Sequence, residues 1–242
     1  MFTVLDHLST KAIPVGERLI LALDTPDADQ ARSLVQDLGD AVGFYKLGLE
    51  LFMAGDYFPL IDWLKARGKK VFVDLKFFDV PRTVGAAVAQ LRGRGADFAT
   101  VHGNDRILEA AVAEKAETRI LAVTALTSLD QADMTDLGFE TDVANLVLSR
   151  ARRALALGCD GVISSGLEAK ALREELGGHF LVVVPGIRPA TNVDDQKRTV
   201  DVEEAFLNGA DYIVVGRPIR ETAKPREAAE AIQGRIAKLF AA

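Results

Sequence analysis

Short apolar runs recur along the chain at regular intervals and divide it into similar units. They cover residues 19–24, 44–49, 70–76, 98–102, 120–126, 161–165, 181–187 and 212–217. Most of them are almost continuously apolar, which is typical of strands that are covered on both faces of a parallel sheet. The pattern therefore predicts eight parallel β-strands.

The segments between these runs have the apolar spacing of helices that bury one face. Examples are the sets Ala31, Leu34, Val35, Leu38 and Val84, Val88, Leu91. Several segments end in small turn-forming residues before the next run. Eight β–α units in 242 residues predict one domain, residues 1–242, folded as a single-domain (β/α)8 TIM barrel with a short extra N-terminal helix.

An open, doubly wound α/β sheet is the alternative architecture. It often binds dinucleotides through a G-x-G-x-x-G turn after the first strand. This chain has no such turn after residues 19–24, so a dinucleotide-binding fold has no direct support.

Composition narrows the classes of partner. The sequence is 49% hydrophobic and 26% charged, as in soluble globular proteins, and no apolar run approaches the roughly 18 residues of a membrane span. A formal net charge of −6 argues against nucleic acid or an anionic membrane as a general partner. The N-terminal residues do not resemble a signal peptide. Cys159 is the single cysteine, so we expect a cytoplasmic protein without an intrachain disulfide.

Polar residues stand at or near nearly every predicted strand end. They are Asp24, Lys46, Asp74, Lys76, Asp79, His102, Thr127, Ser128, Arg188 and Arg217. Each could be a strand-end group that meets water. Because active sites of (β/α)8 barrels lie at the C-terminal ends of the strands, so many polar ends together favour one shared site.

The charged residues in 70–84, "KVFVDLKFFDVPRTV", are the centre of that hypothesis. Side chains alternate along a strand, so Asp74 and Lys76 should point the same way, toward the barrel mouth. We expect the carboxylates of Asp74 and Asp79 to keep Lys76 protonated. A purely structural ion-pair network is the alternative, and Asp24 and Lys46 on adjoining strands argue against it.

A phosphate site is predicted after the seventh and eighth strands, where barrels commonly bind phosphate. Gly186 and Gly216 allow close backbone approach there, and Arg188 and Arg217 offer fork-shaped donors. The long polar segment 188–199 is typical of a closing lid, and Gln196 within it could reach a phosphate oxygen. The sequence contains no metal signature, since its three histidines are scattered.

These motifs resemble the orotidine 5′-monophosphate decarboxylase family, in its bacterial form. "DLKFFDVPRTV" resembles the signature D-x-K-x-x-D-[IV]-P-x-T, and "LALD", "YKLGLELF", "TVH", "VTALTS", "VVVPGIR", "DQKR" and "DYIVVGRPI" follow the family in order along almost the whole chain. There are two departures. The family usually has His where Phe78 stands, and it often continues "VHA" with a glycine pair where this chain reads "VHGNDR".

The resemblance implies a cofactor-free decarboxylation of orotidine 5′-monophosphate (OMP) to uridine 5′-monophosphate (UMP), the last step of de novo UMP synthesis. It implies that Lys76 protonates C6 and that Asp74 lies against the substrate carboxylate. Asp24 and Lys46 would bind ribose and extend the charge network. The remaining implied substrate contacts are Val80, Pro81, Thr83, Thr127 (preferred over Ser128), Pro185, Arg188, Gln196, Gly216 and Arg217.

The resemblance further implies a homodimer, in which Asp79, Val80 and Thr83 are contributed to the neighbouring active site. Two other functions remain open. One is a Mg²⁺-dependent sugar-phosphate aldolase or keto-acid decarboxylase that shares the barrel and D-x-K-x-x-D, although Pro81, Thr83 and "DQKR" favour the nucleotide enzyme. The other is a non-catalytic barrel that binds a phosphate ligand.

Overall fold

Eight parallel strands close a barrel in the computed structural model, which describes residues 7–187 and 200–241. They are β1 (Leu19–Ala22), β2 (Phe44–Leu47), β3 (Lys70–Phe77), β4 (Phe98–Val101), β5 (Arg119–Val123), β6 (Gly161–Ile163), β7 (Leu181–Val184) and β8 (Tyr212–Val215). Each strand pairs with the next, and β8 closes the ring by pairing with β1, with Leu19 opposite Ile213. The predicted (β/α)8 barrel is confirmed and the open sheet is excluded.

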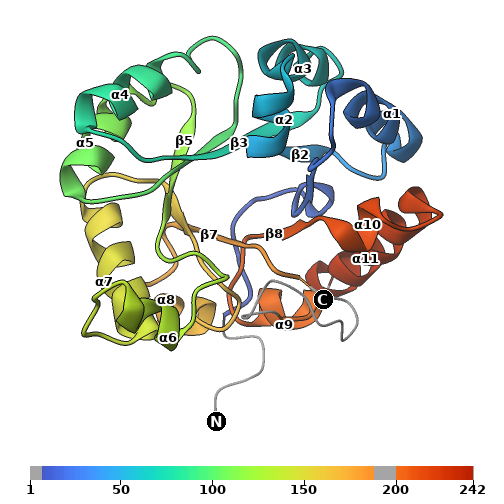
Figure 1. Cartoon of the computed structure of the whole chain (residues 1–242). Coiled ribbons are helices and arrows are strands. Elements are labelled where there is room, and N and C mark those ends of the chain that lie inside the picture. Colours follow the sequence, from blue (N-terminus) through green and yellow to red (C-terminus); the bar gives the residue numbers. More distant parts are fainter. Residues whose placement is uncertain (1–6, 188–199, 242) are drawn as a thin grey trace.

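Helices surround the barrel and provide the connections between strands (Figure 1). In the described residues they are α1 (Ala28–Leu38), α2 (Leu49–Ala54), α3 (Tyr57–Lys65), α4 (Pro81–Ala89), α5 (Asp105–Glu114), α6 (Gln131–Asp136), α7 (Val143–Ala156), α8 (Ala169–Leu176), α9 (Val202–Leu207), α10 (Arg217–Arg220) and α11 (Pro225–Phe240). The extra helix expected before the first strand is one 3₁₀ turn, η1 (Val15–Glu17). All strands except β3 end one to three residues before the corresponding apolar runs do, so the run ends form loops at the barrel mouth.

Local sequence explains the first helix well. Asp27 caps α1, because its carboxylate accepts a hydrogen bond from the backbone N–H of Gln30 at 2.8 Å. Ala31, Val35 and Leu38 are buried against the barrel, as their spacing predicted. Gly39 then ends the helix at φ +54, a backbone conformation that favours glycine.

An aromatic layer fills the barrel interior below the mouth. Phe44 and Phe98 have ring centroids 5.0 Å apart, and Tyr212 meets the two rings edge-on at 5.9 and 5.2 Å. Phe72 joins from β3, with its ring 5.9 Å from that of Phe98. These rings make the barrel a packed core, so polar groups above them lie on an apolar floor.

Three aspartates tie the strands together at the end opposite the mouth. Asp97, Asp160 and Asp211 each stand directly before an even-numbered strand and follow Gly-Ala or Gly-Cys, with the glycine at positive φ. Each carboxylate accepts the backbone N–H of the second residue of the preceding strand and pairs with a cation from the helical region before it. The N–H donors are Val71, Ile120 and Val182, and the cations are Lys65, Lys115 and Arg173.

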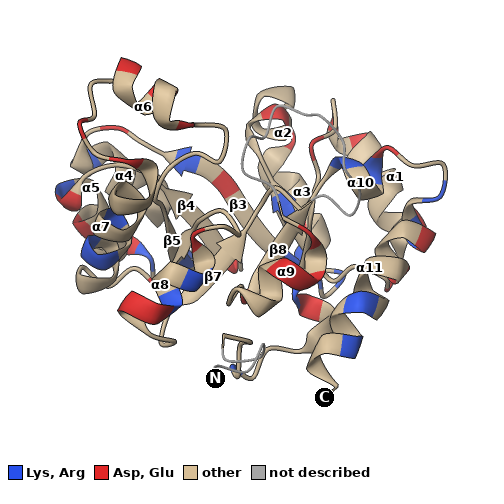
Figure 2. Cartoon of the chain, turned by 90° about the horizontal axis from the view of Figure 1, so that it is seen from below, with Lys and Arg blue, Asp and Glu red and all other residues tan. Residues whose placement is uncertain are grey.

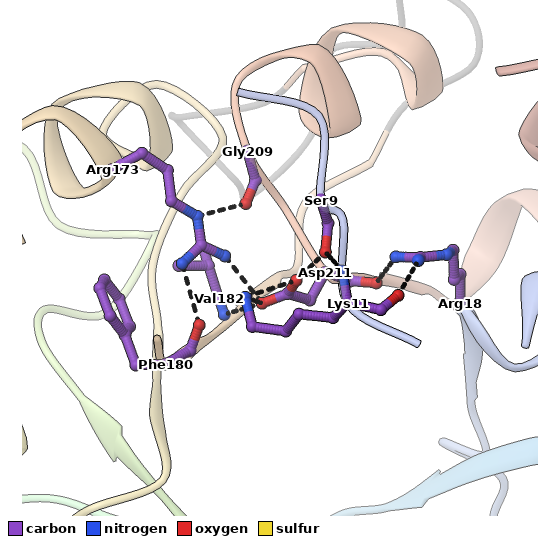
Figure 3. Close-up of polar contacts among 8 residues, drawn as sticks. All are labelled: Ser9, Lys11, Arg18, Arg173, Phe180, Val182, Gly209 and Asp211. Atoms are coloured by element: carbon purple, nitrogen blue, oxygen red, sulfur yellow. Dashed lines mark hydrogen bonds and ion pairs between the residues drawn. The ribbon is translucent and has the colours of Figure 1, made fainter. Parts of the chain in front are cut away.

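Asp211 is the most heavily bonded of the three (Figure 3). Its fully buried carboxylate accepts hydrogen bonds from Ser9 Oγ, Lys11 Nζ, Arg173 and the N–H of Val182, at 2.5 to 3.1 Å. Its backbone carbonyl accepts from Arg18. This one residue therefore holds the segment before β1, helix α8 and strand β7 together.

Replacing Asp211 with asparagine should lower the free energy of unfolding by about 3 kcal/mol, because it leaves the cations of Lys11 and Arg173 without a counter-charge. Urea unfolding followed by circular dichroism, at one protein concentration, measures the change. Asp40→Asn is the matched control, since Asp40 is an exposed partner of Arg226 and its loss should matter little. Equal stability of the two variants would contradict the account.

Candidate active site

A cavity of about 250 Å³ opens at the barrel mouth, at the C-terminal ends of the strands. Helices α2 and α6 lie at this end of the barrel, and α11 ends at the opposite end (Figure 2). Residues from six strands (β1, β2, β3, β5, β6 and β8), from loops after β1, β5, β7 and β8, and from α10 line the cavity: Ala22, Asp24, Lys46, Phe72, Asp74, Lys76, Val123, Ala125, Leu126, Thr127, Ile163, Pro185, Gly186, Val214, Gly216, Arg217 and Arg220. One wall carries four alternating charges, and the β7–β8 side carries two guanidinium groups.

The four charges form a continuous chain across three neighbouring strands. Lys46 Nζ lies 3.3 Å from Asp24 Oδ1 and 3.3 Å from Asp74 Oδ2. Lys76 Nζ lies 2.9 Å from Asp74 Oδ1. Lys46, rather than Lys76, is thus the lysine held between two carboxylates within one chain, and Lys76 lies at the end of the row.

The charges stabilise one another in a poorly solvated place. Burial disfavours the ammonium form of Lys46, but Asp74 and Asp24 outweigh this cost and raise its pKa above the usual range. Burial alone would raise the pKa of Asp74, yet Lys46, Lys76 and a hydrogen bond from Thr100 lower it. Both groups therefore stay ionised at neutral pH, and Lys76 faces a fixed anion.

The backbone beneath Lys76 is irregular. Lys76 has φ +47, in the left-handed region that non-glycine residues seldom adopt. Val73 pairs with Ala99 and Phe77 with Val101, so the register between β3 and β4 shifts around Lys76. Such outliers persist only where surrounding contacts fix them, and they cluster at functional sites.

Most of the candidate residues expected at the mouth line the cavity. They are Asp24, Lys46, Asp74, Lys76, Thr127, Pro185, Gly216 and Arg217. Arg188 and Gln196 lie outside the described residues. The remaining candidates are exposed and do not line this cavity; they are Asp79, Val80, Pro81, Thr83 and Ser128.

Asp79 does not flank Lys76 in the way the sequence suggested. Within the chain, its carboxylate accepts a hydrogen bond from the neighbouring N–H of Val80 at 2.6 Å. His102 also turns away from the shared site, into a neighbouring hollow beside Phe78 and Arg150. Burial and the nearby cations of Arg150 and Lys76 lower the pKa of His102 and favour its neutral form.

The two departures from the family pattern lie in contact. The ring of Phe78 stacks edge-on against His102, with centroids 5.2 Å apart. A Cβ on Gly103 would come within 2.7 Å of Ile107 Cδ1 and 3.1 Å of the Phe78 ring. Glycine in "VHGNDR" therefore leaves space for both side chains.

Sequence reasoning missed three residues of the site. Thr100 is fully buried on β4 and donates to Asp74. A side chain at Gly48 would put its Cβ 3.3 Å from Asp24 Oδ1 and 3.4 Å from Lys46 Nζ, so glycine leaves space for that ion pair. Arg220 lines the cavity beside Arg217. The second arginine of "GRPIR" was a visible signal for Arg220, whereas Thr100 and Gly48 needed the pairing of strands.

Two further features are absent from the part of the chain that the structure describes. Over residues 7–187 and 200–241, no group of three or more His, Cys, Asp or Glu side chains is placed to hold a metal ion. Across the same residues, no helix has the length and apolar character needed to span a membrane.

A closed parallel barrel with titratable groups collected at its mouth defines a TIM-barrel enzyme. Comparison with known proteins specifies the family. A family model described as "Orotidine 5'-phosphate decarboxylase / HUMPS family" matches residues 17–232. The chain belongs to this family.

Individual relatives agree with the assignment. A protein of Methylococcus capsulatus named orotidine 5′-phosphate decarboxylase is 67% identical, over 98% of this chain and 99% of the relative. One of Stenotrophomonas maltophilia with the same name is 50% identical, over 93% and 95% of the two chains. The crystal structure of orotidine 5′-phosphate decarboxylase from Lactobacillus acidophilus matches with a TM-score of 0.80 and 36% identity, over 91% and 99%. The chain is accordingly an enzyme, a carboxy-lyase.

Proposed function

We propose that this protein converts OMP to UMP and CO₂ without a cofactor, as the last step of de novo UMP synthesis. One observation carries the proposal: an ammonium, Lys76 Nζ, lies 2.9 Å from a buried carboxylate at the wall of the mouth cavity. Relatives named for this activity support it over nearly the whole chain.

The charge chain suits the breaking of a C–C bond at C6. The bond between C6 and the carboxylate breaks, CO₂ leaves, and the electron pair stays on C6. Lys76 Nζ then gives a proton to C6 and later regains one from solvent. A fixed cation beside C6 stabilises the negative charge as it develops, and Asp74 and Lys46 keep that cation in place without reorganisation.

The side of the cavity after β7 and β8 suits the phosphate. Gly216 and Arg217 follow β8, and Arg220 stands one helical turn further along α10. Guanidinium forks match phosphate oxygens well, and this is where barrels commonly bind phosphate. Arg188 and Gln196 would add to the grip. Binding energy from this distant group can then help to hold C6 against Lys76.

We further propose a homodimer in which Asp79, Val80 and Thr83 complete the neighbouring site. Exposed apolar side chains beside them support this, since Phe78 is 68% and Val80 62% exposed. Exposed apolar groups of this size next to a site are typical of an interface. Because Asp79 lies outside its own cavity, it is available to a second copy of the chain.

Turnover of OMP tests the function directly. The purified protein, dialysed against EDTA, should convert OMP to UMP at full rate, followed as the loss of substrate absorbance. Activity that EDTA abolishes and Mg²⁺ restores would instead support the metal-dependent aldolase or keto-acid decarboxylase. OMP binding without turnover would support the non-catalytic binder.

A further inference from the structure

Thr100 lies opposite the irregular stretch of β3. Between the paired positions Val73–Ala99 and Phe77–Val101, strand β3 has residues 74, 75 and 76, whereas β4 has Thr100 alone. Two extra residues on one strand interrupt the regular ladder of backbone hydrogen bonds. The groups released by this bulge need other partners.

The hydroxyl of Thr100 makes hydrogen bonds to two residues of this stretch, Lys76 and Asp74. Its Oγ1 accepts a hydrogen bond from the backbone N–H of Lys76 at 3.0 Å. It donates to Asp74 Oδ1 at 2.9 Å. A hydroxyl has one proton and two lone pairs, so it can do both at once. Thr100 is fully buried and is not among the residues that line the cavity.

These two bonds fix the two residues on which the chemistry depends. The N–H of Lys76 is held while its backbone stands at φ +47, a conformation that the surroundings must impose. Asp74 Oδ1 accepts from Thr100 and Lys76 together, which leaves Oδ2 turned to Lys46 at 3.3 Å. One hydroxyl thus sets both the direction of Lys76 and the rotation of the Asp74 carboxylate.

We propose that Thr100 is a positioning residue for the decarboxylation: without touching substrate, it holds Lys76 and Asp74 in the geometry that the reaction requires. The inference rests on the proposed function and deepens it. Valine fills the same volume but can neither accept nor donate a hydrogen bond, whereas serine keeps the hydroxyl.

Kinetics of Thr100→Val and Thr100→Ser test the proposal. We expect Thr100→Val to lower kcat about 30-fold, with KM changed less than about 3-fold, because the lost bonds orient groups rather than bind substrate. Thr100→Ser should keep kcat within about 3-fold of the unchanged protein. A kcat for Thr100→Val near that of the unchanged protein would overturn the inference, as would a serine variant as slow as the valine variant.

Thr124→Val is the matched control. Thr124 is equally buried, directly follows β5, and donates its hydroxyl to the carbonyl of Ile163 at 2.9 Å, away from the charge chain. The Thr124→Val enzyme should be less stable than the unchanged protein but should keep its kcat. If both valine variants lose kcat equally, the effect of Thr100 is one of general stability and the proposal fails.

A crystal structure of Thr100→Val separates this inference from the proposed function. We expect Lys76 to leave the left-handed region and Nζ to move out of hydrogen-bond range of Asp74. An unchanged backbone and ion pair would overturn the role of Thr100, whatever substrate the enzyme uses. Failure of the unchanged protein to act on OMP would refute the function alone.

Discussion

Replacing Lys76 with alanine should lower kcat for OMP by about 10⁴-fold or more, because one change removes the proton donor and the cation closest to Asp74. The fold should persist. Asp74 keeps Lys46 and Thr100 as partners, and alanine at φ +47 is no more strained than lysine, since both have a Cβ. Loss of absorbance at saturating OMP measures kcat, and circular dichroism checks the fold.

Lys70→Ala is the control for this variant. Lys70 begins the same strand, has the same side-chain exposure of 36%, and pairs with Glu17 at 2.5 Å, but it lies at the far end of the barrel. It should keep kcat within about 3-fold, as expected for a partly exposed pair away from the chemistry. A Lys76→Ala enzyme within tenfold of the unchanged protein would rule out Lys76 as the proton donor.

The Asp79→Ala enzyme should also lose most of its activity, and mixing it with the Lys76→Ala enzyme should restore part of that activity. In a dimer of one Lys76→Ala chain and one Asp79→Ala chain, one site lacks both groups and the other has both. Free exchange of equal amounts makes half of the dimers mixed, so about one quarter of all sites should be active. The mixture's kcat per chain, measured after subunit exchange, tests the expected trans contribution of Asp79.

Mixing Lys76→Ala with the double variant Lys76→Ala/Asp79→Ala should restore nothing, because no chain then supplies Lys76. Recovery there would show that the regained activity has another source. Verified mixed dimers that stay inactive would count against Asp79 acting across the interface, while Lys76 would keep its role.

The barrel and much of its mouth could be predicted because their signals are local. Apolar runs mark strands that are buried on both faces, and polar residues after them mark strand ends. The strand ends themselves were placed too late, since residues such as Thr124 and Ala125 stay buried after β5 has ended. The aspartates of "GADF", "GCDG" and "GADY" were visible as turns only, and their bonds needed neighbouring strands to be placed side by side.

The charge chain depends on which strands are neighbours. Alternation correctly put Asp74 and Lys76 on one side, but the bulge opposite Thr100 arises from the pairing of β3 with β4. The carboxylates around Lys46 come from the loop after β1 and from β3, so Lys46 lies between two carboxylates, where Lys76 was expected. Asp79 was expected to flank Lys76, but within the single chain its carboxylate accepts a hydrogen bond from the N–H of Val80 instead.

One measurement tests the central claim most directly: NMR analysis of the product formed from OMP by the unchanged protein in D₂O. The protons of the Lys76 ammonium exchange with solvent, so proton transfer to C6 must carry deuterium. The account predicts UMP deuterated at C6, formed together with CO₂. Unchanged OMP, or UMP with ordinary hydrogen at C6, would contradict it.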